Sequence, residues 1–489
     1  MGLRILIAAS IAALLPGCGD SGPQGYASAP AYAVATDSRA SVTPVITCGE
    51  PILLDGGVYV FPGVPDGMGW VARDGKLQLF VNHEWPKAVG TSAGPLASGA
   101  RISELTLEGG KVVAGRPAID EVWMGEPASK ARAGSVAIAK LCSAYLAGAR
   151  EGFDPPMFLT GEETSGKDAS DPLGGQAFGL AEGALYALPK LGRAPWENLV
   201  VVPGTGATTA VVGFEDAPAA GDGLHAELYL YVGTKDKTGI DPPARNGLRG
   251  GKLFTFVPRD AAQGSEAAVK DKGKPVPGRW VEMDASKSDA ALDAAAVAAG
   301  AFRFVRIEDG APDPSHPGTL YFTTTGRPLT CNPLGRVWKL EIDPKDPAAG
   351  GTITIVLDGS EGIVSPDNID VNAHGELAIC EDPVPGLESL GLKRDSSLWI
   401  YEIPTAKLTR VLEVSRAAAN GHWVKADPAL NSIDKGEDKP GGWEFSGVVD
   451  AEGAFGRGAW LINVQAHGLK TRNPAIVQGG QILRFGWKP

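Results

Sequence analysis

Short β-rich runs separated by turn residues are the feature that most limits how this chain can fold. Runs such as Leu77–Asn82, Glu227–Val232 and Trp460–Val464 recur along the sequence, with Gly, Pro, Asp and Asn clustered between them. The 489 residues include 66 Gly and 38 Pro, which suits many tight turns. Roughly twenty strands are too many for one sandwich, whereas radial propeller blades can absorb them. An all-β propeller is therefore predicted, although no repeat of fixed period is visible.

Two alanine-rich segments, residues 129–150 and 286–301, interrupt the strand pattern. Alanine has the highest intrinsic helix propensity, so both segments are expected to be helical. Because they stand alone among strands, we expect them to be small helical insertions on the surface of the propeller.

The charge balance limits the partners of the chain. It carries 45 basic and 57 acidic residues, a net charge of −12, and has no basic run. Nucleic-acid-binding surfaces are basic, so nucleic acid is not expected as a partner. An acidic chain suits cations as partners, or substrates that bind through cations. The chain is also expected to be a monomer.

The N-terminus resembles a bacterial export signal. Arg4 precedes an apolar stretch, Ile5–Leu15, that is too short to span a bilayer. The following Leu15-Pro16-Gly17-Cys18 resembles a lipobox, so residues 1–17 are predicted to be a lipoprotein-type signal peptide and Cys18 the lipidated residue. Cleavage nearby by ordinary signal peptidase is the alternative.

The segments after Cys18 complete the predicted organisation. Residues 18–44 are rich in Ser, Ala, Gly and Pro and are predicted to be a flexible tether. Residues 45–489 are predicted to form a single propeller domain. The protein is thus expected to be exported and to face the periplasm or the cell surface, with only the lipid on Cys18 contacting the membrane.

Four cysteines remain after Cys18, and an even number in an oxidising compartment permits two disulfides. They are Cys48, Cys142, Cys331 and Cys380. Three pairings are possible and the sequence does not choose among them. Four buried free thiols are the alternative.

Acidic residues recur where apolar strands end. Examples are Glu162-Glu163, Glu215-Asp216, Glu308-Asp309 and Glu381-Asp382, and related positions are Glu84, Asp367-Asn368 and Glu444. In a propeller, such strand ends meet at the central channel. Clustered carboxylates raise one another's pKa, and bound cations resolve this conflict. For any single pair, a cap on a surface turn is the alternative.

Hard oxygen ligands of this kind suit Ca²⁺. The candidate ligands are Glu84, Glu162, Glu163, Glu215, Glu308, Asp309, Asp367, Asn368, Glu381, Asp382 and Glu444. Asn82, His83 and His467 are secondary candidates, for which a structural role is the alternative. No HExxH motif, P-loop or G-x-S-x-G elbow occurs, which disfavours a zinc hydrolase, a nucleotide-binding site and a serine triad.

Taken in order, the motifs resemble the PhoX-type alkaline phosphatase family. They are Phe80-Val-Asn-His-Glu84, Gly161-Glu-Glu-Thr164, Arg306-Ile-Glu-Asp-Gly310 followed by Asp313-Pro314, Pro366-Asp-Asn-Ile-Asp370, Cys380-Glu-Asp-Pro383, Ser446-Gly-Val-Val-Asp450 and Val464-Gln-Ala-His467, and they span about residues 50–470. The resemblance implies a six-bladed propeller of exported bacterial enzymes. Those enzymes hydrolyse phosphomonoesters with calcium and iron.

The resemblance also implies individual roles. Arg306-Ile307-Glu308-Asp309 matches the family's Arg-Pro-Glu-Asp element, which implies that Arg306 contacts phosphate and that Glu308 binds a metal. A salt bridge from Arg306 to Glu308 or Asp309 is the structural alternative. Where characterised members carry Cys-Glu-Glu with an iron-binding cysteine, this chain has Gly161, which weighs against Fe³⁺.

The expected function is therefore an exported, metal-dependent phosphatase, with Arg306 and Glu308 as its catalytic residues and a phosphate ester as its substrate. Two alternatives remain. One is a calcium-dependent propeller hydrolase of lactones or other esters. The other is a non-catalytic surface module that calcium stabilises, because a fold does not fix a function.

Overall fold

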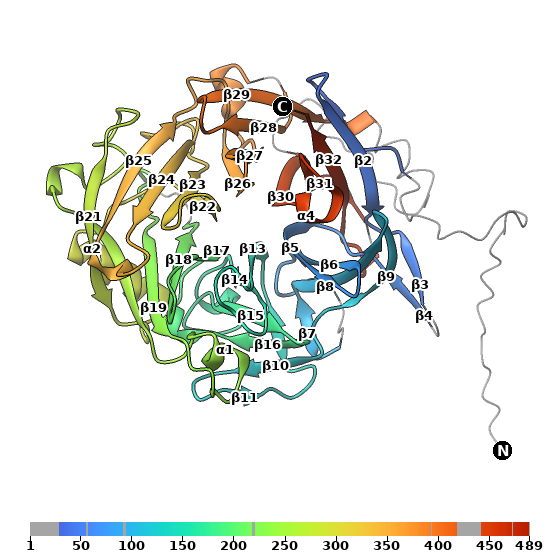
Figure 1. Ribbon diagram of the computed structural model, residues 1–489, viewed down its shortest axis with the longest axis horizontal. Coiled ribbons are helices and arrows are strands. Elements are labelled where there is room, and N and C mark those ends of the chain that lie inside the picture. Colours follow the sequence, from blue (N-terminus) through green and yellow to red (C-terminus); the bar gives the residue numbers. More distant parts are fainter. Residues whose placement is uncertain are drawn as a thin grey trace, which may run out of the picture.

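A computed structural model describes residues 29–54, 57–90, 94–217, 221–392, 394–417, 442–471 and 473–488. Its strands form blades around one centre (Figure 1). The innermost strands are β5 (Pro65–Arg73), β13 (Leu141–Ala147), β17 (Trp196–Val201), β22 (Ile307–Pro312), β26 (Pro366–Val371) and β30 (Glu444–Asp450). Each of these six strands contacts the innermost strand of the next blade, and β30 contacts β5, so the ring closes. The predicted all-β, six-bladed propeller is thus confirmed.

The first three blades run outward from the centre in chain order. Blade 1 consists of β5 (Pro65–Arg73), β6 (Lys76–His83), β8 (Arg101–Glu108) and β9 (Lys111–Pro117). Blade 2 consists of β13 (Leu141–Ala147), β14 (Met157–Glu162), β15 (Ala177–Ala181) and β16 (Ala184–Ala187), extended by β10 (Glu121–Met124) and β11 (Ser129–Lys130). Blade 3 consists of β17 (Trp196–Val201), β18 (Thr208–Glu215), β19 (Leu228–Thr234), β20 (Lys252–Pro258) and β21 (Val276–Met283).

The other three blades complete the circle. Blade 4 consists of β22 (Ile307–Pro312), β23 (Thr319–Thr324), β24 (Arg336–Ile342) and β25 (Gly351–Leu357), and β25 pairs with β21. Blade 5 consists of β26 (Pro366–Val371), β27 (Glu376–Glu381), β28 (Ser397–Glu402), β29 (Lys407–Val414) and β1 (Ala33–Ala35). Blade 6 consists of β30 (Glu444–Asp450), β31 (Ala459–Lys470), β32 (Gln478–Trp487) and β2 (Ala40–Thr47).

The remaining elements lie outside the blades. β3 (Pro51–Leu54) and β4 (Gly57–Val60) form a hairpin, and β7 (Leu96–Gly99) pairs in parallel with β12 (Val136–Ile138). The helices are α1 (Pro242–Arg245), α2 (Asp289–Ala299), α4 (Glu452–Phe455) and the short 3₁₀ turns η1 (Gly166–Asp168), η2 (Pro189–Leu191), η3 (Ala261–Gln263), η4 (Pro347–Ala349) and η5 (Leu387–Leu390). Among the described residues, no helix is long and apolar enough to cross a membrane.

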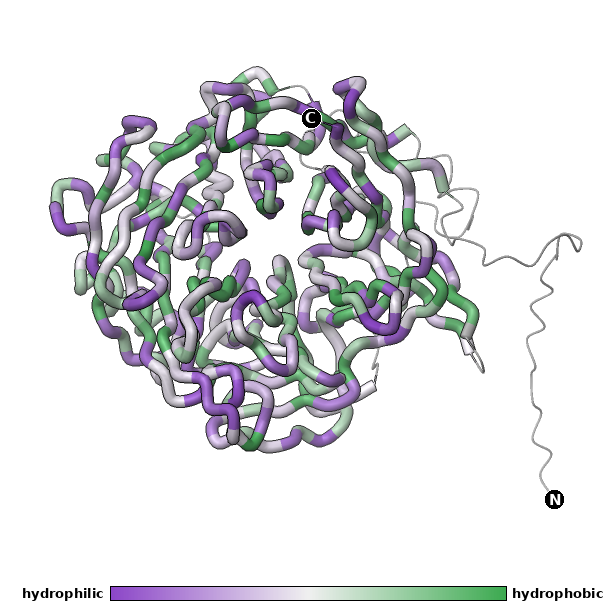
Figure 2. The backbone as a smooth tube through the Cα atoms, viewed as in Figure 1, coloured by the Kyte–Doolittle hydropathy of each residue, from purple (hydrophilic) through white to green (hydrophobic). Residues whose placement is uncertain are grey.

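Apolar side chains pack between and within the blades, and Figure 2 shows hydrophobic segments along the strands and hydrophilic segments at many outer turns. The buried residues include six tryptophans that are almost fully enclosed, among them Trp196 and Trp338. This packing holds the inner strands in fixed register, which is what positions the residues at the centre.

Two predictions about local structure need correction. Of the alanine-rich segments, residues 286–301 contain α2 as expected, but residues 129–150 contain β11, β12 and β13. Strand β13 is innermost, where small side chains allow close packing. A Cβ on Gly67 would lie 2.2 Å from the Ala144 nitrogen, so tertiary contacts override the helix propensity of alanine here.

The predicted tether was also placed too far along the chain. β1 pairs with β29 and β2 pairs with β32 over Ala40–Thr47, so the propeller begins before residue 45. The predicted signal peptide and Cys18 lie outside the described residues. Cys48, Cys142, Cys331 and Cys380 are all free thiols in this structure, as in the alternative to two disulfides, although only Cys48 and Cys380 are fully buried.

Candidate metal centre

The innermost strand of every blade begins in the same register with the second strand. The first pairs are Pro65–His83, Leu141–Glu162, Trp196–Glu215, Ile307–Thr324, Pro366–Glu381 and Glu444–Gln465. A β-bulge directly follows this pair in blades 1 to 5, and in blade 6 it follows the next pair, Phe445–Val464. Bulges redirect side chains, so equivalent residues of the six blades can face the same point.

The first residue left unpaired by each bulge forms what we call the donor ring. Its members are Asp66, Cys142, Glu197, Glu308, Asp367 and Ser446. Five of the six blades therefore contribute a carboxylate or a thiol, and the sixth contributes a hydroxyl. The blades repeat in structure although the sequence shows no repeat, because what recurs is the position of this residue in the strand pairing and not its identity.

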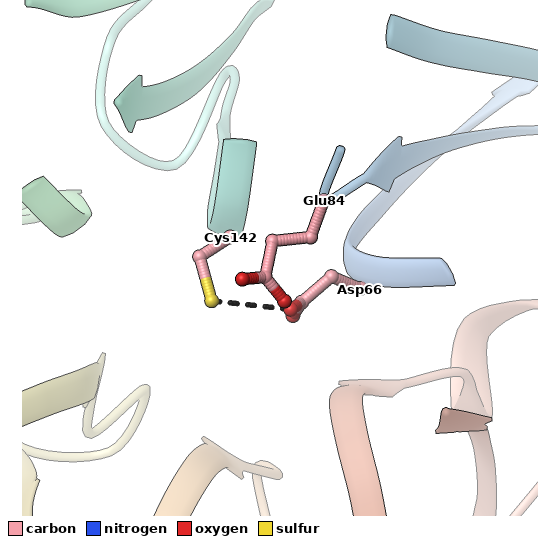
Figure 3. A group of neighbouring side chains, drawn as sticks. All are labelled: Asp66, Glu84 and Cys142. Atoms are coloured by element: carbon pink, nitrogen blue, oxygen red, sulfur yellow. Dashed lines mark hydrogen bonds between the residues drawn. The ribbon is translucent and has the colours of Figure 1, made fainter. Parts of the chain in front are cut away.

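Ligand atoms of these residues lie close together in three overlapping groups. Within each group, all the atoms are within 4.8 Å of one another. The groups are Asp66–Glu84–Cys142, Cys142–Glu163–Glu197 and Glu197–Glu308–Asp367. Figure 3 shows the first group, in which the Cys142 thiol donates a hydrogen bond of 3.1 Å to Asp66 Oδ2. Shared members join the three groups into one continuous set of donors.

A second layer of acidic residues surrounds the donor ring. Its members directly follow the second strand in blades 1 to 5: Glu84, Glu163, Asp216 and Asp382, with Thr325 in the fourth blade. Thr325 donates a hydrogen bond of 2.6 Å to Glu308 Oε1. The second layer thus supplies further carboxylates and positions one ring member.

Two cations of the chain lie among these acids. Lys140 Nζ is 2.8 Å from Glu163 Oε2 and 3.4 Å from Glu84 Oε1. Arg306 Nη2 is 2.9 Å from Asp216 Oδ2 and 3.0 Å from Glu308 Oε1. The salt bridge to Glu308 that the sequence offered as an alternative role for Arg306 is therefore present.

Lys140 and Arg306 also share an unusual backbone conformation. Each directly precedes an innermost strand and has a positive φ, 43° and 58° respectively. Val64 and Ser365, which precede β5 and β26, have positive φ as well. A positive φ is sterically strained for residues other than glycine, and such strain is found mainly at functional sites. Four of the blades thus enter the centre through a strained residue.

Burial and crowding raise the pKa values of the carboxyl groups. The pKa of Asp66 rises to about 7 through burial and the neighbouring Glu84. The pKa of Asp216 rises to about 6 through burial, against the opposing effect of Arg306. Burial and nearby carboxylates also raise the pKa values of Glu197, Glu308 and Asp367. Without added positive charge, several of these groups must stay protonated near neutral pH.

A metal ion fits this arrangement of donors. Asp367 Oδ1 is buried and has no hydrogen-bond partner among the described residues, so its lone pairs are free to bind a cation. Clustered carboxylate oxygens suit hard cations such as Ca²⁺, and the Cys142 sulfur suits a softer transition metal. The residues present could therefore bind metal.

Sequence reasoning missed Asp66, Cys142 and Glu197. One signal for Asp66 was available, since Val64-Pro-Asp-Gly67 and Ser365-Pro-Asp-Asn368 start equivalent strands with the same Pro-Asp pair. Nothing local distinguishes Cys142 or Glu197 from other strand residues. Of the predicted ligands, the structure brings Glu84, Glu163, Glu308 and Asp367 into the three groups of donors.

Three predicted ligands have their carboxylates occupied elsewhere. Glu162 accepts hydrogen bonds from the backbone of Ala139, Ser170 and Gln176 and from the Ser170 hydroxyl. Glu381 accepts from Arg394, Trp399 and two backbone amides. Glu215 accepts from the Glu227 amide at 3.1 Å. Each precedes a residue of the second layer, and successive strand residues point to opposite faces, so these three face into the blades.

Asp309 and Asn368 form a second, deeper level of contacts between blades. Asp309 accepts a hydrogen bond of 2.5 Å from Asn198 and one of 3.0 Å from the Ile369 amide. Asn368 donates a hydrogen bond of 2.5 Å to Ser143 Oγ. Beyond this level a cavity of about 630 Å³ opens toward the other end of the propeller. Asp309 and Asn368 thus tie blades together beneath the donor ring.

The secondary candidates support the site rather than form it. Asn82 Nδ2 donates hydrogen bonds to the Cys142 and Ser143 carbonyl oxygens, which fixes the strand that carries the thiol. His83 is fully buried between the Gly63 carbonyl and Ser103, and burial lowers its pKa to about 3.

Blade 6 adds a more peripheral pair. His467 Nε2 is 3.4 Å from Glu444 Oε1. The pKa of Glu444 is raised by burial and by its neighbour Asp382. Glu444 and Asp382 therefore lie together at the blade 5–blade 6 side of the site.

Gly161 lies where the resemblance places the family's iron-binding cysteine. Gly161 packs against the blade, and a Cβ there would lie 2.3 Å from Trp196 Cβ, so no longer side chain fits. The thiol at the centre comes instead from Cys142 on the neighbouring innermost strand. A thiol is therefore present at the centre, although position 161 does not supply one.

No protein-family profile matches the sequence, and no curated protein matches it at a significant level. Among solved structures, the chain is similar to Pseudomonas fluorescens PhoX in complex with vanadate, a transition state analogue. The identity is 15%, the TM-score is 0.65, and the match covers 94% of this chain and 97% of that one.

Two further structures match more distantly. PQQ-bound aldose sugar dehydrogenase from Streptomyces coelicolor has 11% identity, a TM-score of 0.36 and coverage of 92% and 99%. A putative glycoside hydrolase from Parabacteroides distasonis has 9% identity, a TM-score of 0.29 and coverage of 86% of each chain. At these identities the likeness to PhoX concerns the fold, so this chain has a PhoX-like propeller fold.

Proposed function

We propose that this protein is an exported, metal-dependent phosphatase that hydrolyses phosphomonoesters through cations held at the donor ring. The observation that carries the proposal is the donor ring itself, in which five blades place a carboxylate or a thiol at one register beside the Arg306 guanidinium. The PhoX-like fold supports it, since the similar structure holds a vanadate described as a transition state analogue.

The residues suggest which cations are bound. Asp66, Glu84, Glu197, Glu308 and Asp367 are the oxygen ligands proposed for Ca²⁺, and Cys142 with Glu163 is proposed to add iron. Bound cations would supply positive charge that attracts the phosphate ester and polarises its oxygens. That charge is needed, because the carboxylates alone would repel an anionic substrate.

Arg306 is proposed to position the substrate. Its Nε and Nη2 are held by Asp216, and its Nη1 has no hydrogen-bond partner among the described residues. A guanidinium fixed in this way can direct its remaining N–H groups at phosphate oxygens with little loss of side-chain entropy. Glu308 both binds the guanidinium and belongs to the donor ring, so it links substrate positioning to cation binding.

The cellular setting is part of the proposal. The lipobox at Leu15–Cys18 supports export and a lipid anchor on Cys18, facing the periplasm or the cell surface. A monomer is proposed, with the phosphate ester as the partner of the site and the anchor as the contact with the membrane.

Glu308→Gln tests the proposal. The variant keeps the shape of the side chain but removes its charge, so turnover of p-nitrophenyl phosphate is expected to be lost while the fold remains. Glu376→Gln is the matched control, because Glu376 is equally buried but pairs with Arg457 away from the donor ring. EDTA should abolish turnover by the wild type.

Unchanged turnover by Glu308→Gln would contradict the proposal. Hydrolysis of lactones but not of phosphate esters would point to the alternative esterase function. A chelator-sensitive melting temperature without turnover of either class would indicate a binding module.

A further inference from the structure

Strand directions place the donor ring and the N-terminal end of the described chain on the same face. Every innermost strand starts at the donor ring, so each second strand ends there. In blade 5, β29 ends on this face, and β1 starts there because Ala33 pairs with Val414. We call this side of the propeller the donor face.

Hydrogen bonds fix the residues just before β1 on the donor face. The Ser415 amide donates to the Tyr32 carbonyl at 2.8 Å, and the Tyr32 amide donates to Gln481 Oε1 at 2.7 Å. Gln481 lies near the start of β32, which begins on the same face as β31 ends. The chain therefore enters the propeller on the donor face, at the outer edge of blade 5, where β1 is the outermost strand.

The distance from this point to the predicted lipid is short. Residues 18–29 span at most about 40 Å if fully extended, because a residue adds at most ~3.6 Å. An anchor at Cys18 thus keeps the point where the chain enters the donor face within about 40 Å of the lipid.

Exposed leucines are found on the loops of the donor face. Leu329 is 98% exposed in the β23–β24 loop, and Leu390 is 51% exposed at the end of η5, in the β27–β28 loop. The two loops touch, since a Cβ on Gly386 would lie 3.5 Å from Pro328. Leu173, 43% exposed, lies in the β14–β15 loop on the same face. A leucine that is exposed in water gains free energy by entering a lipid interface.

We propose that the donor face docks on the bilayer that anchors Cys18, with Leu329 and Leu390 inserted at the lipid surface. The inference rests on the lipid anchor of the proposed function and adds the orientation of the molecule. It places the end of the propeller that carries the donor ring toward the membrane.

Photocrosslinking tests the orientation. The full-length lipidated chain, carrying p-benzoylphenylalanine in place of Leu329 or Leu390, is reconstituted into vesicles of phosphatidylethanolamine and phosphatidylglycerol. The matched control carries the same residue in place of Ile240, which is 97% exposed but lies in the β19–β20 loop on the opposite face. Lipid adducts measured by mass spectrometry are expected severalfold more often at positions 329 and 390 than at 240.

Each outcome decides a different claim. Equal yields at the three positions, or a higher yield at 240, would overturn the proposed orientation while leaving the anchor intact. A mature chain whose mass shows no lipid on Cys18 would overturn the anchor, and the orientation with it. Crosslinking does not depend on turnover, so it cannot fail merely because the chain is not a phosphatase.

Discussion

At the scale of single residues, neighbouring acids in this molecule have different roles. Three pairs of adjacent acids show this difference: Glu162-Glu163, Glu215-Asp216 and Glu381-Asp382. In each pair, the first side chain points into the blade, and the second lies just after the strand and points toward the centre. The alternation of side chains along a strand causes this division. Hydrogen bonds satisfy the carboxylates of Glu162 and Glu381, and Glu215 accepts one from the Glu227 amide, whereas the second member of each pair lies toward the centre.

Glu162 and Glu163 allow this division to be tested on adjacent positions. Glu163→Gln is expected to lower the calcium and iron content per chain, because it removes a donor close to Cys142 and Glu197. Glu162→Gln is expected to leave the metal content unchanged but to cost about 1–3 kcal/mol of stability, through impaired hydrogen bonding to the Ser170 and Gln176 amides.

Elemental analysis and melting temperatures in EDTA would separate the two effects. Loss of metal from Glu162→Gln with Glu163→Gln fully loaded would contradict the assignment of the two faces.

Under the proposed function, Cys142 is the residue expected to affect the choice of metal most. Cys142→Ser keeps the size of the side chain and replaces a soft donor with a hard one, so iron per chain is expected to fall while calcium is retained. Cys380→Ser is the control, because Cys380 is buried in β27 and is not a member of the donor groups. Equal iron content in both variants and the wild type would show that the thiol is not a ligand.

At the scale of elements, the β-bulge at the start of each innermost strand organises the centre. The bulge leaves a residue unpaired in all six blades, and this residue is an acid or a thiol in five of them. The second strands then bring further acids to the same end. A propeller can therefore bring together possible metal ligands that are far apart in the sequence.

Blade 6 is completed by β2, which comes from the other end of the chain. Ile46 in β2 is fully buried, so Ile46→Ala is expected to lower the free energy of unfolding by about 2–5 kcal/mol. Thr43 lies on the exposed side of the same strand, and Thr43→Ala is expected to change the free energy of unfolding by less than about 0.5 kcal/mol. Calorimetry of the two variants measures this difference. Equal, small effects would mean that this segment behaves as a tether after all.

At the scale of the whole molecule, the centre is a concentration of negative charge that the fold holds together. Lys140 and Arg306 offset part of this charge, each by pairing with two acids. The remaining carboxyl groups need protons or metal cations. Stability should therefore depend on both pH and metal.

The metal-free protein is expected to become less stable as the pH rises. The folded pKa values of Asp66 and Asp216 are about 7 and about 6, raised from 3.8, so the folded state holds their protons more tightly than the unfolded state. The contribution of these two groups to the free energy of unfolding is full below pH 3.8 and is lost as the pH rises to about 7.

Melting temperatures in EDTA should fall between pH 5 and 8, and adding Ca²⁺ should remove much of this fall, since bound cations replace the protons. Identical pH profiles with and without Ca²⁺ would argue against cation binding at the donor ring.

The sequence by itself determined the class of fold and the general nature of the site. Strand density with abundant turn residues is enough to predict a propeller, and acids at strand ends are enough to predict that negative charge meets at its centre. Both signals are local: they lie within a few residues along the chain. For the same reason Glu84, Glu163, Glu308 and Asp367 could be identified without coordinates.

Only the tertiary structure decided which acids face the centre and which other residues join them. Glu162 and Glu163 look equivalent in the sequence, and strand register separates them. Cys142 lies in a segment whose alanines favour a helix, yet packing against blade 1 makes it an innermost strand. Asp66 and Glu197 become neighbours of distant residues because the ring of blades closes, and closure is a property of the whole chain.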